Sequence, residues 1–256
     1  MTRAVGDQDS GVQIVEATRR RCHRTGWLVC GAGSLVVVAA IGFLIPIFVS
    51  DPDDSVRIAL LNVPLMSVYF VGAGFLITWV TNRRLDEAVG WLAEGRAPTE
   101  QEHRQTLGYA AYTSKVAAIA WILGGVVVLA LNAASYSPGL AAVMGTTVWL
   151  GGETSCAILY LIQEHNLRPV TARALDARPP SKAAMPGVRD RLLVVWVLGT
   201  GVPLLGVLMV GVVGLAKPDV DSEYVAAAAL FLGVVASAAG LLATAIAART
   251  IADPLT

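Results

Sequence analysis

The chain has 256 residues, of which 55% are hydrophobic and only 15% charged, and its mean hydropathy is +0.63. A soluble protein of this length alternates its apolar residues to cover one core, whereas here they form long uninterrupted blocks, which excludes a soluble globular domain. The formal net charge is zero, and only three cysteines are present, which leaves no disulfide framework.

Six apolar runs follow one another along the chain, and each has the roughly 17–25 residues that cross a bilayer as a helix. Short loops join them in pairs, so we predict an all-α polytopic membrane protein made of three helical hairpins. The predicted organisation is an N-terminal segment, a transmembrane domain and the start of a linker, at residues 1–26, 27–248 and 249–256. The predicted spans are 27–49, 58–80, 116–134, 140–162, 192–216 and 225–248.

Positive charge is distributed unevenly between the two ends of these spans. If the N-terminus is cytoplasmic, all of the 19 Lys and Arg residues except Arg57 and Lys217 lie on the cytoplasmic side. The positive-inside rule therefore predicts a multi-pass protein of the cell membrane with both termini in the cytoplasm. Within the first segment, residues 10–24 are expected to form either a basic helix on the inner leaflet or a solvated tail.

The second and fourth spans continue into similar segments. A shift of 82 residues places Leu85 on Leu167 and Pro98 on Pro180 without a gap, which favours a parallel internal repeat over chance similarity of hairpins. These coupling segments are expected to be amphipathic helices, and a capping box is expected at 99–102. The residues singled out in these coupling segments are Leu85, Leu92, Glu164, Arg168, Pro169 and, at the chain's end, Pro254.

A few polar or helix-breaking residues lie within the predicted spans. Asn62 and Asn132 are interpreted as hydrogen-bonding groups between helices or as ligand contacts. Glu153 is the ionisable residue at membrane depth, and it indicates either a functional group or a protonated side chain that hydrogen-bonds inside the bundle. Pro203 is expected to kink the fifth span near its middle.

The sixth span carries two stripes of small residues at a spacing that permits close helix packing. The stripes comprise Ala229, Gly233, Ser237, Ala236 and Gly240. They are expected to serve either a homodimer or the bundle itself.

The sequence holds no recognisable catalytic motif, phosphate-binding glycine loop or nucleic-acid-binding surface. His23, His103 and His165 lack a second ligand at metal-binding spacing, so no metal site is predicted. Membrane lipids are the expected partners, and an apolar or lipid-like ligand between the spans is plausible.

The order and spacing of several segments resemble the six-span membrane region of actinobacterial, mycobacterial-type class III adenylate cyclases that continue into a HAMP linker. The resemblance covers nearly the whole chain from residue 27, and it is carried by 91–99, 160–175, 199–206 and 248–256. It implies a dimeric sensor whose membrane region regulates a cytoplasmic module that makes cAMP from ATP with Mg²⁺ or Mn²⁺. The chain contains no cyclase domain, so its expected role is the membrane anchor and receptor part.

Two other functions are consistent with the residues. A small transporter or channel component would use Glu153 near the midplane. An input domain of another HAMP-linked sensor, such as a histidine kinase, would share the expected architecture.

Overall fold

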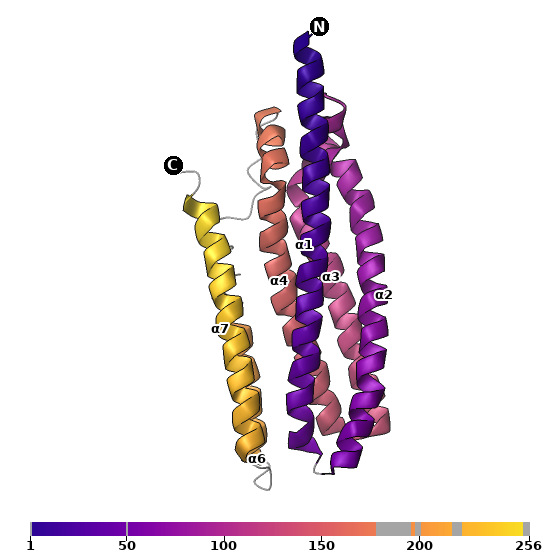
Figure 1. Ribbon diagram of the computed structural model, residues 1–256, viewed down its shortest axis with the longest axis vertical. Coiled ribbons are helices and arrows are strands. Elements are labelled where there is room, and N and C mark those ends of the chain that lie inside the picture. The colour runs from indigo at the N-terminus through magenta and orange to yellow at the C-terminus, as the bar shows by residue number, and fades with distance from the viewer. Residues whose placement is uncertain (1, 50, 178–195, 198–200, 217–221, 253–256) are drawn as a thin grey trace.

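The computed structural model describes residues 2–49, 51–177, 196–197, 201–216 and 222–252. These residues are almost wholly helical, and the described part contains no strand. The helices are α1 (Thr2–Phe48), α2 (Pro52–Ala93), α3 (Glu100–Ser135), α4 (Pro138–Ala177), α6 (Val202–Ala216) and α7 (Ser222–Ala252). Figure 1 shows α1 to α4 as a long bundle, with α6 and α7 lying beside it as a separate hairpin.

Four of these helices are long and apolar enough to cross a membrane, namely α1, α2, α3 and α7. Helix α6 is apolar but short, with 15 described residues. Helix α4 is the exception, since it has ample length but carries Thr, Ser, Gly and Glu residues in the middle of its predicted span. The composition of α4 follows from its place in the bundle: it packs against α3 and α1 and needs little apolar surface facing outward.

The turn between α2 and α3 is defined by local hydrogen bonds. Gly95 adopts φ 65°, a backbone conformation that glycine reaches without steric cost, and Arg96 N donates to Trp91 O across the end of α2. Thr99 and Glu102 form the predicted capping box at the start of α3. The Arg96 guanidinium donates to both carboxylate oxygens of Glu102, at 2.7 and 2.5 Å. The predicted capping box at 99–102 is therefore confirmed.

The hydrophobic core of the four-helix bundle has two parts. The central core cluster lies within the predicted spans and is built around Val37, Trp121, Met144, Val148 and Leu159. The terminal core cluster lies at the end that holds the N-terminus, where it joins all four helices. Its members are Val15, Cys22, Leu85, Ala88, Val89, Trp91, Leu92, Tyr109, Leu167, Val170 and Ala174.

The terminal core cluster corrects one sequence expectation and supports another. Residues 10–24 form neither a separate surface helix nor a tail; they continue α1 without a break, and Val15, Thr18 and Cys22 are buried against the bundle. Leu85 and Leu92 lie on a buried face, as the amphipathic pattern predicted, and Leu167 joins them in the same cluster. The segments that follow the second and fourth predicted spans therefore meet.

The α6–α7 hairpin packs on the bundle through a third apolar cluster. Val210 and Ala228 contact Leu44, Ile47 and Val143 there, and further along Ala243 packs with Leu161. Ala229 packs on this cluster, and Ala236 lines a crevice between α7 and the bundle. Both residues therefore face the bundle. Ser237 is exposed, and a Cβ added at Gly233 would meet open space. The predicted small-residue stripes are thus divided between two faces of α7.

The hydrogen bonds of the capping box give the Glu102 carboxyl a low pKa. Glu102 lies outside the predicted spans. Hydrogen bonds from Arg96, with smaller contributions from Thr99, lower the pKa of Glu102 from 4.5 to about 2. Because the pKa is lower in the folded state, the network stabilises α3 above pH 4.5 and loses that contribution as the pH falls through about 2.

A carbon-13 NMR titration of the Glu102 carboxyl should therefore give a midpoint near 2. Arg96→Ala should raise this midpoint towards the ordinary value. Arg104→Ala is the matched control, because Arg104 pairs with Glu100 instead. A midpoint that does not respond to Arg96→Ala would contradict the assigned cause.

Candidate functional site

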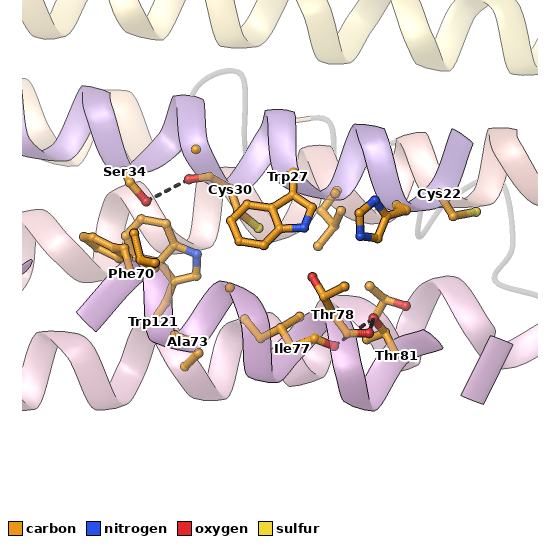
Figure 2. Close-up of a pocket in the computed structure, with 18 of the residues that line it drawn as sticks. Cys22, Trp27, Cys30, Ser34, Phe70, Ala73, Ile77, Thr78, Thr81 and Trp121 are labelled. Atoms are coloured by element: carbon orange, nitrogen blue, oxygen red, sulfur yellow. Dashed lines mark hydrogen bonds between the residues drawn. The ribbon is translucent and has the colours of Figure 1, made fainter. Parts of the chain in front are cut away.

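A cavity of about 360 Å³ opens between α1 and α2 and has the size of a small-molecule site. Figure 2 shows Trp27 and Cys30 of α1 facing Ile77 and Thr78 of α2 across it. Trp121 of α3 and Leu159 of α4 also line it. Leu35 and Val71 line its rim and are 73% and 53% exposed, so the cavity opens on the side of the bundle within the predicted spans.

The position of α2 beside α1 depends on a glycine. A Cβ at Gly74 would lie 2.9 Å from the Trp27 ring, so only glycine lets the indole lie against this part of α2. The same indole contacts Phe75 edge to face, with the ring centroids 5.3 Å apart. Trp27 therefore forms a wall of the cavity and fixes the spacing of the two helices there.

The lining changes in character along the helices. Towards the end that holds the N-terminus it is polar, with Cys22, Thr81, Asn82, Tyr109, Thr113 and Gln163. Further along α1 and α2 it is mainly apolar and aromatic, with Leu35, Val38, Phe70, Val71 and Trp121. The cavity is thus amphipathic along its length, and its polar end borders the terminal core cluster.

The hydroxyl groups of the polar end are already engaged with backbone oxygens. Thr81 Oγ1 donates to Ile77 O at 2.8 Å, and Thr113 Oγ1 donates to Tyr109 O at 3.0 Å. Tyr109 Oη donates to Thr81 O at 3.3 Å and links α3 to α2. The hydroxyl protons of Thr81, Tyr109 and Thr113 are therefore all donated to backbone oxygens of the protein.

Gln163 is the polar residue that links this end of the cavity to α1. Its side chain is 2% exposed, and its Nε2 donates to Cys22 O at 3.0 Å. One turn further, Asn166 Nδ2 donates to Thr25 Oγ1 at 3.0 Å. Gln163 Oε1 has no hydrogen-bond partner within the protein. Among the described residues it is the one buried side-chain nitrogen or oxygen without such a partner.

The two asparagines singled out in the sequence form a reciprocal pair between α2 and α3. Asn62 Nδ2 donates to Asn132 Oδ1 at 3.0 Å, and Asn132 Nδ2 donates back to Asn62 Oδ1 at 2.8 Å. Each amide also donates to a carbonyl of its own helix, at Ile58 and Val128. Both side chains are buried and lie outside the cavity lining. The interpretation as an inter-helix hydrogen bond is supported.

Glu153 lies on the outer face of α4. The residue is exposed, makes no hydrogen bond or ion pair with the described residues, and lines neither this cavity nor the crevice beside α7. The expectation that it hydrogen-bonds inside the bundle is therefore wrong. The exposed position arises because the opposite side of α4, which carries the buried Val148 and Ser155, faces the bundle.

The other predicted positions are distributed away from the cavity. Pro203 is the second residue of α6 as described, and proline suits the first turn of a helix. Pro169 lies inside α4 without ending it, whereas Pro254 lies outside the described residues. Glu164 and Arg168 are half-buried on α4. The described residues contain no group of three His, Cys, Asp or Glu side chains that could hold a metal ion.

A second, almost wholly apolar crevice of about 510 Å³ separates the α6–α7 hairpin from α1 and α4. Its lining includes Val36, Gly151, Gly206, Leu232 and Ala239. The hairpin therefore packs less completely against the bundle than the four long helices pack against one another.

Sequence reasoning missed Gln163, Trp27 and Trp121 as site residues. Gln163 directly follows the apolar run 159–162, just past the end of the fourth predicted span, where polar residues are common. The available signal was its spacing from two apolar residues on the same helix. Leu159 and Leu161 lie four and two residues before it. The role of the tryptophans depends on which helices adjoin, which no pattern within one helix reveals.

The asparagine pair predicts strongly non-additive mutational effects. Asn62→Leu or Asn132→Leu alone leaves one buried amide unpaired, which should lower the free energy of unfolding by about 1–3 kcal/mol. The double variant leaves neither amide behind, so it should cost less than the sum of the two single variants. Unfolding titrations in mixed micelles measure the cycle, and simple additivity would contradict the pairing.

Comparison with curated proteins finds relatives in mycobacteria. Uncharacterized protein Rv1319c of Mycobacterium tuberculosis is 34% identical over 182 residues, which cover 69% of this chain and 33% of the relative. Uncharacterized protein Rv1318c of the same organism is 29% identical over 195 residues, with 73% and 34% covered. Uncharacterized protein Mb1354c of Mycobacterium bovis is 27% identical over 147 residues, with 56% and 25% covered.

This chain therefore spans about a third of the length of the first two relatives. No protein-family model matches it. No solved structure matches it either. The similarity places the chain beside a set of longer mycobacterial proteins.

Proposed function

We propose that this chain is the membrane-embedded sensory and anchoring part of a longer signalling protein, with six crossings and both termini in the cytoplasm. The observation that carries the proposal is the continuity of the helices. The same α1, α2, α3 and α4 that line the cavity continue beyond the predicted spans and close on the terminal core cluster. A change in their spacing at the cavity is therefore transmitted along stiff helices to that cluster.

The distribution of charge supports the proposed orientation. The terminal core cluster is surrounded by basic residues, including Arg19, which pairs with Asp86, and Arg84, which pairs with Glu87. Arg83 also lies over the Trp79 ring at 4.3 Å, a combination typical of a membrane interface. At the other end Asp51 caps α2, and Asp53 and Asp54 occupy its first turn. The basic end is therefore proposed to be cytoplasmic.

The proposed output is the synthesis of cAMP from ATP by a module that follows Thr256 through a HAMP linker. Its support is the sequence resemblance described above, together with relatives about three times as long as the matched part. Helix α7 continues to Ala252 as one helix, so it could pass a displacement directly to such a linker. The Mg²⁺ or Mn²⁺ and the catalytic dimer belong to that module in this proposal.

The physical logic is a population shift. A ligand that binds one arrangement of α1 and α2 more tightly than another biases the bundle towards that arrangement. The gap beside the α6–α7 hairpin leaves that hairpin room to reposition against α1 and α4. The repositioning would then reach the C-terminal end of α7.

Labelling with a membrane-impermeant maleimide tests the proposed orientation of the first and third hairpins. In a background without Cys22, Cys30 and Cys156, a cysteine at Asp53 or Glu223 should react in intact cells. A cysteine at Ala97 or Ala177 should react only after permeabilisation, because these exposed positions lie at the opposite end of the helices. Equal reactivity of Asp53→Cys and Ala97→Cys in intact cells would contradict the topology.

Crosslinking within the terminal core cluster tests the coupling. A Leu85→Cys and Leu167→Cys pair, joined by a short bifunctional thiol reagent in the full-length protein, should change the rate of cAMP formation about fivefold or more. Each single-cysteine variant treated with the same reagent is the control. An unchanged rate after complete crosslinking would overturn transmission through this cluster.

A further inference from the structure

The cavity between α1 and α2 is open along one side within the apolar part of these two helices. Its apolar part is walled by Trp27, Phe70 and Trp121 (Figure 2). Leu35 and Val71 at the rim are largely exposed, so an apolar chain can enter sideways from a bilayer. Both helices are long and apolar enough to cross a membrane. The apolar part of the cavity therefore suits an acyl chain.

A group of arginines borders the other, polar end of the cavity. Arg20 and Arg24 lie one turn apart on α1, on either side of His23 in the sequence, and His23 lines the cavity. On α2 the guanidinium of Arg83 lies over the Trp79 ring, at 4.3 Å from its centroid. All three arginines are exposed. Two helices thus bring positive charge to the same end of the cavity.

Helical spacing places Arg24 on the open side of the cavity. Arg24, Gly31 and Leu35 follow one another at intervals of seven and four residues, so they share one side of α1. Gly31 and Leu35 both line the cavity. Arg21 lies on another side, one turn before Thr25, whose hydroxyl accepts a hydrogen bond from α4. Arg24 therefore stands over the cavity opening, and Arg21 does not.

The arginines beside the cavity have no carboxylate partner in the described part of the chain. Asp86, which α2 directs towards α1, is already bridged to Arg19. No ion pair within the described ranges involves Arg20, Arg24 or Arg83. A phosphate group supplies the complementary charge, because a guanidinium donates two parallel hydrogen bonds to phosphate oxygens.

The two ends of the cavity together specify the ligand. One end takes an apolar chain, and the other takes an anion at the level of Trp79, an exposed tryptophan of the kind found at membrane interfaces. A phospholipid carries both groups in one molecule, and basic pockets between membrane helices are typical sites for anionic head groups. A choline head group brings its own cation close to the arginines, so a head group with net negative charge fits better.

We propose that the cavity between α1 and α2 holds one acyl chain of an anionic glycerophospholipid, whose phosphate binds Arg24 together with Arg20 and Arg83. The second acyl chain stays in the bilayer beside the exposed rim. Binding requires only that these two helices cross a bilayer. That the lipid comes from the cytoplasmic leaflet rests on the proposed function.

Photolabelling of the 256-residue chain in phosphatidylcholine nanodiscs tests the site. The probes are phosphatidylglycerol and phosphatidylcholine, each with a diazirine in one acyl chain and each added at the same mole fraction. Mass spectrometry compares labelling of peptides containing 27–38 and 70–78 with labelling of 119–127, an exposed stretch of α3 that serves as the reference. The ratio of phosphatidylglycerol to phosphatidylcholine labelling should be about fivefold higher, or more, in the cavity peptides.

Two pairs of variants separate this site from general attraction and packing. Arg24→Gln should lower the ratio in the cavity peptides about fivefold, whereas Arg21→Gln removes the same charge outside the opening and should leave the ratio unchanged. Gly31→Leu should fill the cavity and reduce its labelling by phosphatidylglycerol, whereas Gly72→Leu should not. A Cβ at either glycine meets open space, and of the two only Gly31 lines the cavity.

The outcomes distinguish the site from the proposed orientation. Equal ratios in the cavity and reference peptides of the unaltered chain overturn the proposal without requiring any variant to fold. Equal losses from Arg24→Gln and Arg21→Gln also overturn it, because general attraction of anionic lipid predicts that result. Labelling unaffected by Gly31→Leu contradicts a chain inside the cavity. Specific labelling combined with a reversed maleimide topology would support the site and contradict the proposed function.

Discussion

The close packing of α4 between α3 and α1 is the constraint on which the other features of the bundle depend. A Cβ at Gly152 would lie 2.6 Å from Trp121, so glycine is needed where α4 meets α3. In lipid the driving force for helix association comes from such close contacts, because the surrounding acyl chains are as apolar as the side chains. The small residues of α4 therefore provide the packing, and among the four bundle helices α4 is the one not counted as apolar enough to cross a membrane.

Two consequences follow from the burial of α4. Its polar residues are available inside the bundle, where Gln163 and Asn166 reach across to α1. Its outer face carries Glu153, which is exposed even though it lies in the middle of a predicted span. The cavity then forms where the large Trp27 ring, and not a pair of small residues, sets the distance between α1 and α2.

Continuous helices join the central core cluster to the terminal core cluster, and the proposed function rests on this continuity. No loop separates the central core cluster from the terminal core cluster, since α1, α2, α3 and α4 contribute to both regions. A long helix is stiff along its axis, which is why the proposed function links packing at the cavity with packing at Leu85 and Leu167. In the same proposal the α6–α7 hairpin, which a crevice separates from α1 and α4, is the part that responds.

How much of this could be predicted from the sequence depends on the range of the interactions. Apolar run lengths predicted the helices, and the capping box of Thr99 and Glu102 predicted the start of α3, because caps involve residues close in the chain. The amphipathic pattern likewise identified the buried face of Leu85 and Leu92. The same reasoning failed for residues 10–24, whose burial depends on three other helices.

The sequence by itself therefore determined that this is a helical membrane protein with hairpins, capped turns and a basic end. Only the tertiary structure decided that Asn62 pairs with Asn132, that Glu153 faces outward, and that Gln163 leaves an oxygen unpaired beside a cavity. The physical reason is that hydropathy and helix capping are properties of one segment. Burial of a polar atom and the partner it finds are instead set by the rotation and spacing of neighbouring helices.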